Sequence, residues 1–141
     1  MRKANELFEY NKKNDYGKSM NDKMTYSLFQ YCARQFEDDE VGKMSFVGIL
    51  YYQPSAQFVQ WYGVVITNRR LIVGLAGFFG SEHVTFNLED FKGLSKSDGA
   101  LYSIITFLHP KKNINIGVQR HKLDEIFEDI LANTDLQDMS K

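Results

Sequence analysis

The residues best suited to chemistry are three histidines, one cysteine and one acidic run. The histidines are His83, His109 and His121, and none stands two or four positions from another, so their spacing does not form a histidine-based metal site. Cys32 has no basic neighbour on its predicted helix except Arg34, and a structural helix cysteine is a simpler interpretation than a nucleophile. A nucleophilic role would require a distant histidine to approach the thiol.

The acidic run is Glu37–Glu40. Its carboxylates could hold a divalent cation, because hard cations prefer oxygen ligands. The run lacks the alternating Asp/Asn and Gly pattern of a calcium loop, so we interpret it as a solvated connection. The Gly-x-x-x-x-Gly-Lys-Ser/Thr phosphate loop, the hydrolase motif Gly-x-Ser-x-Gly and the Rossmann fingerprint are absent from the sequence. We predict a non-enzymatic protein with no catalytic residue, no metal ligand and no cofactor.

The composition is that of one ordinary globular domain. The chain has 141 residues, 43% of them hydrophobic and 25% charged, and its formal net charge is −1. Residues 41–118 carry seven Lys/Arg against four Asp/Glu, so even this most basic part has a net charge of only +3. Nucleic-acid binding needs a basic face that replaces counterions, and we therefore predict no nucleic-acid partner.

Cysteine content and hydropathy bear on the cellular location. A single cysteine cannot form an intramolecular disulfide. The first residues lack the apolar core of a signal peptide, and no run approaches the ~20 apolar residues of a membrane-spanning helix. We expect a cytoplasmic protein.

The spacing of apolar residues changes from helical to strand-like near residue 44. A short helix is predicted over 2–13, and a second begins at Asn21 or Asp22, either of which can serve as its N-cap. Seven strands follow. The last helix, over 120–132, has apolar residues at i, i+3, i+4, i+7 and i+8. The strands are predicted over 44–52, 58–68, 70–75, 83–88, 91–95, 101–108 and 114–118.

Three features carry a resemblance to a known family. They are the helix before the strands, the hairpin Gly63–Gly74 with Thr67-Asn-Arg-Arg70 at its corner, and the strand end Phe86-Asn-Leu-Glu-Asp-Phe91. Over about residues 22–133 the chain resembles the bacterial YokE-like group of the pleckstrin-homology (PH) and GRAM-like superfamily. The resemblance implies a mostly β fold, in which seven antiparallel strands form two near-orthogonal sheets of a split barrel capped by the C-terminal helix. The domains would be an N-terminal helical extension (1–40), a PH-like domain (41–133) and a polar tail (134–141).

The resemblance also bears on lipid binding. PH domains usually bind phosphoinositides through Lys and Arg in the loop joining the first two strands. Here this loop is Gln53–Gln57 and contains no positive charge, so we predict that no phosphoinositide binds there. Phe78-Phe79 and Lys111-Lys112 stand in two further loops of the same end and would form a weak wedge for an anionic membrane, worth about 1 kcal/mol per lysine. We favour the alternative, in which both phenylalanines fold back over the barrel mouth or the early helices.

Arg69 and Arg70, at the hairpin corner, either bridge acidic groups at the end of the barrel or contact a partner. Domains of the superfamily bind phosphoinositides, peptides or each other, and as a rule they are not enzymes. We predict a binding or assembly module whose partner is a protein or a second copy, with weak binding to a lipid surface as the alternative. An extended peptide could add as a strand in the groove between an edge strand and the closing helix. The leading helices could instead fill this groove, or exchange with a neighbouring chain.

Overall fold

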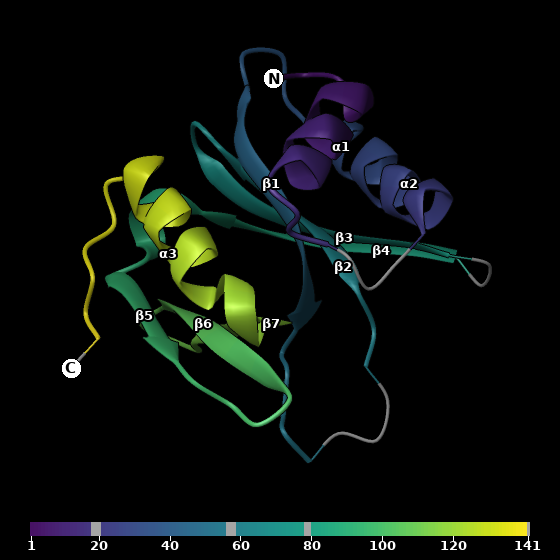
Figure 1. The fold of residues 1–141 in the computed structure, drawn as a ribbon. Coiled ribbons are helices and arrows are strands. Elements are labelled where there is room, and N and C mark those ends of the chain that lie inside the picture. Colours follow the sequence, from purple (N-terminus) through teal and green to yellow (C-terminus); the bar gives the residue numbers. More distant parts are fainter. Residues whose placement is uncertain (18–20, 56–58, 78–79, 141) are drawn as a thin grey trace.

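The computed structural model describes residues 1–17, 21–55, 59–77 and 80–140, which form a seven-stranded sheet and three α-helices (Figure 1). The helices are α1 (Ala4–Lys13), α2 (Asp22–Ala33) and α3 (Leu123–Ala132). The strands are β1 (Gly42–Leu50), β2 (Tyr62–Thr67), β3 (Arg70–Gly77), β4 (Gly80–Asn87), β5 (Gly93–Ser97), β6 (Tyr102–Leu108) and β7 (Ile114–Gln119). Each helix and strand predicted from the sequence is present, with its ends shifted by a few residues.

One continuous sheet contains all seven strands. Its order is β4-β3-β2-β1-β7-β6-β5, and neighbouring strands are antiparallel. β1 joins the two halves, because Gly42–Gly48 pairs with β2 whereas Ile49 and Leu50 pair with β7. The predicted mostly β fold of seven antiparallel strands is therefore confirmed, whereas the strands form one unclosed sheet and not the two near-orthogonal sheets of the predicted split barrel. Within the described residues, β4 and β5 are the two edges and do not pair with each other. The spacing of apolar residues predicts where strands occur, but it does not predict that β1 pairs with β2 along most of its length and with β7 at its end.

The main hydrophobic core lies between the sheet and α3. Figure 1 shows α3 lying against β5 and β6. Its buried face consists of Leu123, Ile126, Phe127 and Ile130, none of which is more than 4% exposed. Burial of each such side chain contributes roughly 1.5–3 kcal/mol. The prediction of an amphipathic C-terminal helix that covers the core is confirmed.

A second core lies on the opposite face of β1, β2 and β3, beneath α1 and α2. Val47, Val65 and Ile72 point into it, while their neighbours along each strand point into the main core. From α2, Leu28 and Phe29 complete the cluster. The middle strands are therefore buried on both faces, which accounts for the uninterrupted apolar run of β2. The N-terminal extension is a packed layer of the structure and not a loose arm.

Two glycines let α2 approach the sheet closely. Gly63 and Gly74 face each other across β2 and β3. A Cβ would lie 3.1 Å from the Cβ of Leu28 if added at Gly63, and 2.9 Å from the Sγ of Cys32 if added at Gly74. The thiol of Cys32 is fully buried at this patch, where its Sγ lies 3.5 Å from the carbonyl oxygen of Gly63. Burial raises the pKa of the Cys32 thiol to about 12, so the thiol is protonated at neutral pH and has the structural environment predicted for it.

Hydrogen bonds join α1 and the segment that follows it to α3 and to Lys122, directly before α3. The hydroxyls of Tyr10 and Tyr16 both donate to Oδ2 of Asp129, at 2.7 and 3.1 Å. The Nζ of Lys122 donates to the carbonyl of Asn14 at 3.1 Å. Partial burial and the Asp129 carboxylate raise the pKa of both tyrosines, which therefore remain neutral donors. These bonds join residues 108 to 119 positions apart and hold the helical layer to the C-terminal helix.

Candidate binding surfaces

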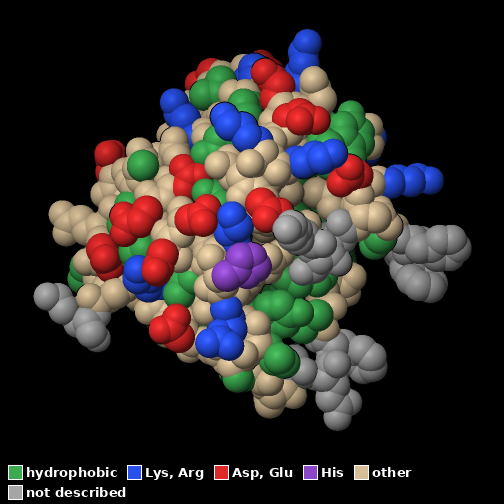
Figure 2. Space-filling model, viewed as in Figure 1, with side chains coloured by type: hydrophobic (Ala, Val, Ile, Leu, Met, Phe, Trp, Pro, Cys, Tyr) green, Lys and Arg blue, Asp and Glu red, His purple; other side chains and the backbone are tan. Residues whose placement is uncertain are grey.

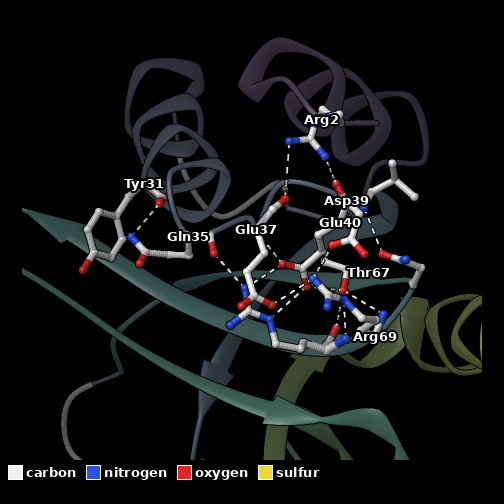
Figure 3. Close-up of polar contacts among 11 residues, drawn as sticks. Arg2, Tyr31, Gln35, Glu37, Asp39, Glu40, Thr67 and Arg69 are labelled. Carbon is white, nitrogen blue, oxygen red and sulfur yellow. Dashed lines mark hydrogen bonds and ion pairs between the residues drawn. The ribbon is translucent and has the colours of Figure 1, made fainter.

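A polar network occupies the corner between β2 and β3 (Figure 3). The hydroxyl of Thr67 accepts hydrogen bonds from the backbone N–H groups of Arg69 and Arg70, at 3.1 and 2.8 Å. The same hydroxyl donates to Oε2 of Glu40 at 2.6 Å. Thr67 thus shapes the turn locally and ties it to the connection between α2 and β1.

Arg70 and Glu40 form a buried ion pair at this corner. The Glu40 side chain is 0% exposed and that of Arg70 is 16% exposed. The guanidinium donates to both carboxylate oxygens, from Nε at 2.9 Å and from Nη2 at 2.6 Å, and Nη2 also donates to the carbonyl of Gln35 at 2.7 Å. Burial alone would raise the pKa of Glu40, but hydrogen bonds from Arg70 and Thr67 outweigh it and lower the pKa to about 2. The interpretation of the acidic run as solvated is therefore wrong for Glu40.

The rest of the acidic run pairs with the neighbouring arginine. Nη2 of Arg69 lies 2.8 Å from Oε1 of Glu37 and 2.9 Å from Oδ1 of Asp39. The guanidinium of Arg2 donates to the backbone carbonyls of Glu37 and Glu40 from the other side. Arg69 and Arg70, the two arginines of the hairpin corner, therefore both bridge acidic groups. The side chain of Arg69 is 41% exposed and keeps a surface that a partner can reach. Contact with a partner stays a prediction.

Lys111 and Lys112, which we predicted as part of a lipid-binding surface, lie in the exposed turn between β6 and β7. Nζ of Lys112 is 4.4 Å from the ring centroid of Tyr51, a cation–π arrangement, and Lys111 is exposed beside it. Tyr51 directly follows β1. The turn that carries Arg69 and Arg70 lies at the other end of β1, because the N–H of Asn68 in this turn donates to the carbonyl of Val41, directly before β1. The structure therefore places the two groups of cations at opposite ends of β1 and does not combine them.

Other parts of the predicted lipid surface are described incompletely. Phe78 and Phe79 lie outside the described residues. Of the loop between β1 and β2, Gln53–Ser55 is exposed. None of the helices in the described ranges is long and apolar enough to span a bilayer.

The three histidines lie apart from one another in different environments. Nδ1 of His83 is 2.9 Å from the hydroxyl of Tyr31, and the ring of His109 packs 5.9 Å from that of Phe91, centroid to centroid. His121 is exposed just before α3. Across the described parts of the chain, His, Cys, Asp and Glu form no group of three or more that could hold a metal ion.

The chain segment after α3, residues 134–140, occupies the outer edge of β5. The backbone N–H of Leu94 donates to the carbonyl of Gln137 at 2.9 Å, and the N–H of Met139 donates to the carbonyl of Leu94 at 2.7 Å. The pairing is parallel. Figure 1 shows this segment, termed the tail, as the yellow end of the chain running beside β5. We predicted a polar tail from the sequence, without this strand pairing.

A notch in β5 receives a side chain of the tail. A Cβ added at Gly93 would lie 2.4 Å from Cγ of Met139, so glycine leaves the space that this side chain needs. Met139 is still 50% exposed and fills the notch with one flank only. The backbone N–H of Lys96 donates to Oγ of Ser140 at 2.9 Å. The outer edge of Gly93–Lys96, termed the β5 seat, therefore offers backbone groups and one apolar notch to an extended segment.

A hollow of about 950 Å³ lies where the tail leaves α3. Arg69, Lys43, Leu88 and Phe91 line it, together with the tail residues Thr134–Leu136. The hollow and the β5 seat are therefore connected through the tail.

The surface next to the β5 seat is acidic. Figure 2 shows acidic side chains gathered over α3, and Asp124, Glu125 and Glu128 are exposed there. Nζ of Lys96 pairs with Oδ1 of Asp124 at 2.8 Å. The hydrogen bond to Asp124 raises the pKa of Lys96, and the charges of Glu128 and Asp138 act in the same direction. Nζ of Lys122 lies 3.2 Å from Oε2 of Glu125, so two of these three carboxylates are paired with lysines.

Seven antiparallel strands followed by a helix that covers the core define a PH-like fold, and solved structures share it. The hSac2 domain from human phosphoinositide phosphatase Sac2 matches with a TM-score of 0.57 and 12% identity, over 79% of this chain and 83% of that one. The C-terminal domain of an unknown protein from Leishmania infantum matches with a TM-score of 0.50 and 14% identity, over 67% and 84%. Autoinhibited Vav1 matches with a TM-score of 0.50 and 8% identity, over 92% of this chain and 22% of that one. At such identities the likeness shows the fold alone.

A model of the family described as "Bacterial PH domain" matches residues 31–131, and the chain belongs to this family. Domains of the PH-like family typically mediate binding or assembly and are generally non-catalytic. The match begins inside α2, so α1 and most of α2 lie outside it. No curated protein matches the chain.

Proposed function

We propose that this protein is a non-enzymatic PH-like binding module that receives an extended segment of another protein at the β5 seat. The tail is the observation that carries the proposal, because Gln137 and Met139 already exchange backbone hydrogen bonds with this edge. Backbone groups that bind one extended segment can bind another, and side-chain notches then add specificity. Binding to a second protein and self-association both remain compatible with such an edge.

The proposal includes three finer assignments that rest on the sequence. They are membership of the YokE-like group, a PH-like domain over 41–133 with the extension 1–40, and a cytoplasmic location. The absence of enzymatic activity is part of the same proposal, and the buried, protonated thiol of Cys32 supports it.

Releasing the tail tests whether the β5 seat binds a segment in trans. Met139→Pro removes the N–H that bonds to Leu94 and the side chain that enters the notch, while α3 and the sheet keep their contacts. In the full chain carrying this substitution, the separate peptide Thr-Asp-Leu-Gln-Asp-Met-Ser-Lys should bind saturably. The amide NMR signals of Leu94 and Lys96 should shift as the peptide is added.

Two glycine variants control this experiment. Gly93→Ala, added to the Met139→Pro chain, should weaken peptide binding roughly tenfold or more, because its Cβ overlaps the site of the apolar side chain. Gly77→Ala, where the nearest atom is 4.0 Å from the added Cβ, should leave binding unchanged. The proposal is wrong if the signals of Leu94 and Lys96 do not respond to the peptide.

A second candidate function is peripheral binding to an anionic lipid surface through Lys111, Lys112, Phe78 and Phe79. The observation that favours it is the exposed pair of Lys112 and Tyr51, since amphipathic rings and lysines are typical of membrane interfaces. Phosphoinositide recognition is not part of this candidate, because the first loop contains no cation.

Vesicle co-sedimentation tests this candidate at low salt. If it is correct, Lys111→Ala/Lys112→Ala should weaken binding to phosphatidylserine vesicles by about 2 kcal/mol, roughly thirtyfold. The exposed pair Lys23→Ala/Lys92→Ala changes the net charge equally and should have a much smaller effect. Failure of the unsubstituted chain to sediment with such vesicles would exclude the lipid surface.

A further inference from the structure

Two apolar side chains of the tail contact the domain at separate places. Leu136 is half-buried, packs against the main core and lines the hollow. Met139 lies at the notch, where Gly93 leaves room for its Cγ. Gln137 and Asp138, between these two residues, are exposed. The tail therefore contacts the domain through two apolar residues three positions apart.

The backbone of the tail sets the direction and register of an extended segment at the β5 seat. The N–H of Leu94 donates to the carbonyl of Gln137 at 2.9 Å, and its carbonyl accepts from the N–H of Met139 at 2.7 Å, in a parallel pairing. A second segment in the same register needs the N–H and the carbonyl of the same residue of β5. The tail and such a segment therefore exclude each other.

The tail fills the β5 seat incompletely. Met139 is 50% exposed. The N–H of Lys96, two residues further along β5, donates to the side-chain Oγ of Ser140 at 2.9 Å. A segment that continued as a parallel strand would present a backbone carbonyl to this N–H instead and would extend the ladder. A partner can therefore form a backbone bond at a position where the tail uses a side chain.

We propose that the tail is a built-in competitor for the β5 seat, and that the partner is an extended segment, parallel to β5, with two apolar side chains three positions apart. This inference rests on the proposed function and names the partner and the regulation of the same site. The first apolar side chain takes the place of Leu136 at the margin of the main core, and the second takes the place of Met139 at the notch.

The end of α3 keeps its own hydrogen bonds when the tail leaves. Oγ1 of Thr134 donates to the carbonyl of Ile130 at 2.8 Å, and Nδ2 of Asn133 donates to the carbonyl of Asp129 at 2.8 Å. Neither bond uses a group of β5, so the tail can exchange without unfolding of α3. The covalent link gives the tail a high effective concentration, and a free segment therefore binds only the fraction of molecules whose tail has left.

Fluorescence anisotropy with a labelled tail peptide tests the competition in the full chain. The peptide is Thr-Asp-Leu-Gln-Asp-Met-Ser-Lys. Two released chains receive it: Met139→Pro, and Leu136→Ala/Met139→Pro, in which both apolar places are vacated. The peptide should bind each released chain roughly tenfold or more tightly than it binds the unsubstituted chain. Met139→Leu, which keeps both the N–H and an apolar side chain, should bind the peptide as weakly as the unsubstituted chain does.

Variants of the peptide test the two-residue pattern on Leu136→Ala/Met139→Pro. Peptides that carry Leu136→Ala or Met139→Ala should bind at least about fivefold more weakly, because each loses one apolar contact. The peptide with Gln137→Ala, a change at an exposed position, should bind unchanged. Exchanging the second and third residues gives Thr-Leu-Asp-Gln-Asp-Met-Ser-Lys, which keeps the composition and charge but places the apolar residues four positions apart. This peptide should bind as weakly as the one with Leu136→Ala.

Failure of the inference can be told apart from failure of the proposed function. Equal affinity of the tail peptide for the unsubstituted chain and for both released chains would overturn the tail as a competitor. If the peptide with exchanged residues bound as tightly as the tail peptide, the pattern of two apolar residues would be overturned. In both cases the β5 seat still binds extended segments, and the proposed function stands. If neither released chain binds any of these peptides, the proposed function fails and the inference fails with it.

Discussion

Replacing Arg70 with methionine should lower the free energy of unfolding at pH 7 by about 3–5 kcal/mol. The Glu40 carboxylate is fully buried, and Arg70 supplies two of its hydrogen bonds. Methionine keeps much of the side-chain volume but leaves this charge without its counter-ion, and an uncompensated buried charge is far costlier than a lost surface contact. Urea unfolding followed by the fluorescence of Trp61, the single tryptophan, measures the difference.

The neighbouring arginine provides the matched control. Arg69→Met removes ion pairs to Glu37 and Asp39, whose side chains are 59% and 78% exposed, and should cost at most about 1 kcal/mol. If Arg70→Met and Arg69→Met lowered the free energy of unfolding by similar amounts, the ion pair between Glu40 and Arg70 would not be desolvated.

The pH dependence of this effect has a definite sign. Folding lowers the pKa of Glu40 from its ordinary value of 4.5 to about 2, so the ionised carboxylate stabilises the folded protein above pH 4.5. This contribution is lost as the pH falls through the interval from 4.5 to about 2. Arg70→Met removes the hydrogen bonds from Arg70, which lower the pKa of Glu40 most, and leaves only those from Thr67 and the backbone N–H of Glu37 against the effect of burial, so the pKa of Glu40 is higher in this variant. The difference in stability between the unsubstituted chain and Arg70→Met should therefore shrink on acidification from pH 7 to pH 4.

Phe29→Ala should destabilise the whole protein by about 3–5 kcal/mol, the usual cost of truncating a fully buried phenylalanine. Phe29 is 0% exposed in the second core, where α2 covers the strands. Because the strands beneath are buried on both faces, loosening α2 exposes apolar surface of the sheet as well as of the helix. Thermal unfolding followed by circular dichroism at helix and aromatic wavelengths measures the loss and shows whether both layers unfold together.

A second substitution in the same helix controls for helix propensity. Met24 is 53% exposed, and Met24→Ala should change the stability by less than about 0.5 kcal/mol. If Phe29→Ala were equally mild, the helical layer would contribute little to the stability of the PH-like core.

The local structure of this protein could be predicted well from its sequence. The N-cap of α2 is Asn21, whose side-chain oxygen accepts from the N–H of Met24 at 2.9 Å, and Asn21 was one of the two predicted caps. The spacing of Leu123 to Ile130 predicted the buried face of α3. Both features depend on residues a few positions apart, which a sequence displays directly.

The binding surfaces could be predicted much less well, because they depend on distant residues. Arg70 reaches Glu40 across 30 positions, and Tyr10 reaches Asp129 across 119, with no local signal of either bond. The pairing of the tail with β5 uses backbone groups that every residue except proline carries. One usable signal was overlooked: the uninterrupted apolar run Val64–Ile66 is typical of a strand covered on both faces.

The place of Cys32 on the buried face of α2 makes the chain's own thiol a reporter of local motion. An alkylating reagent can reach this sulfur only after the helix has separated from the flat patch at Gly63 and Gly74. The raised pKa keeps the reactive thiolate scarce until then. Because this is the single cysteine of the chain, its modification rate measures the opening of that one contact, with no label to be engineered.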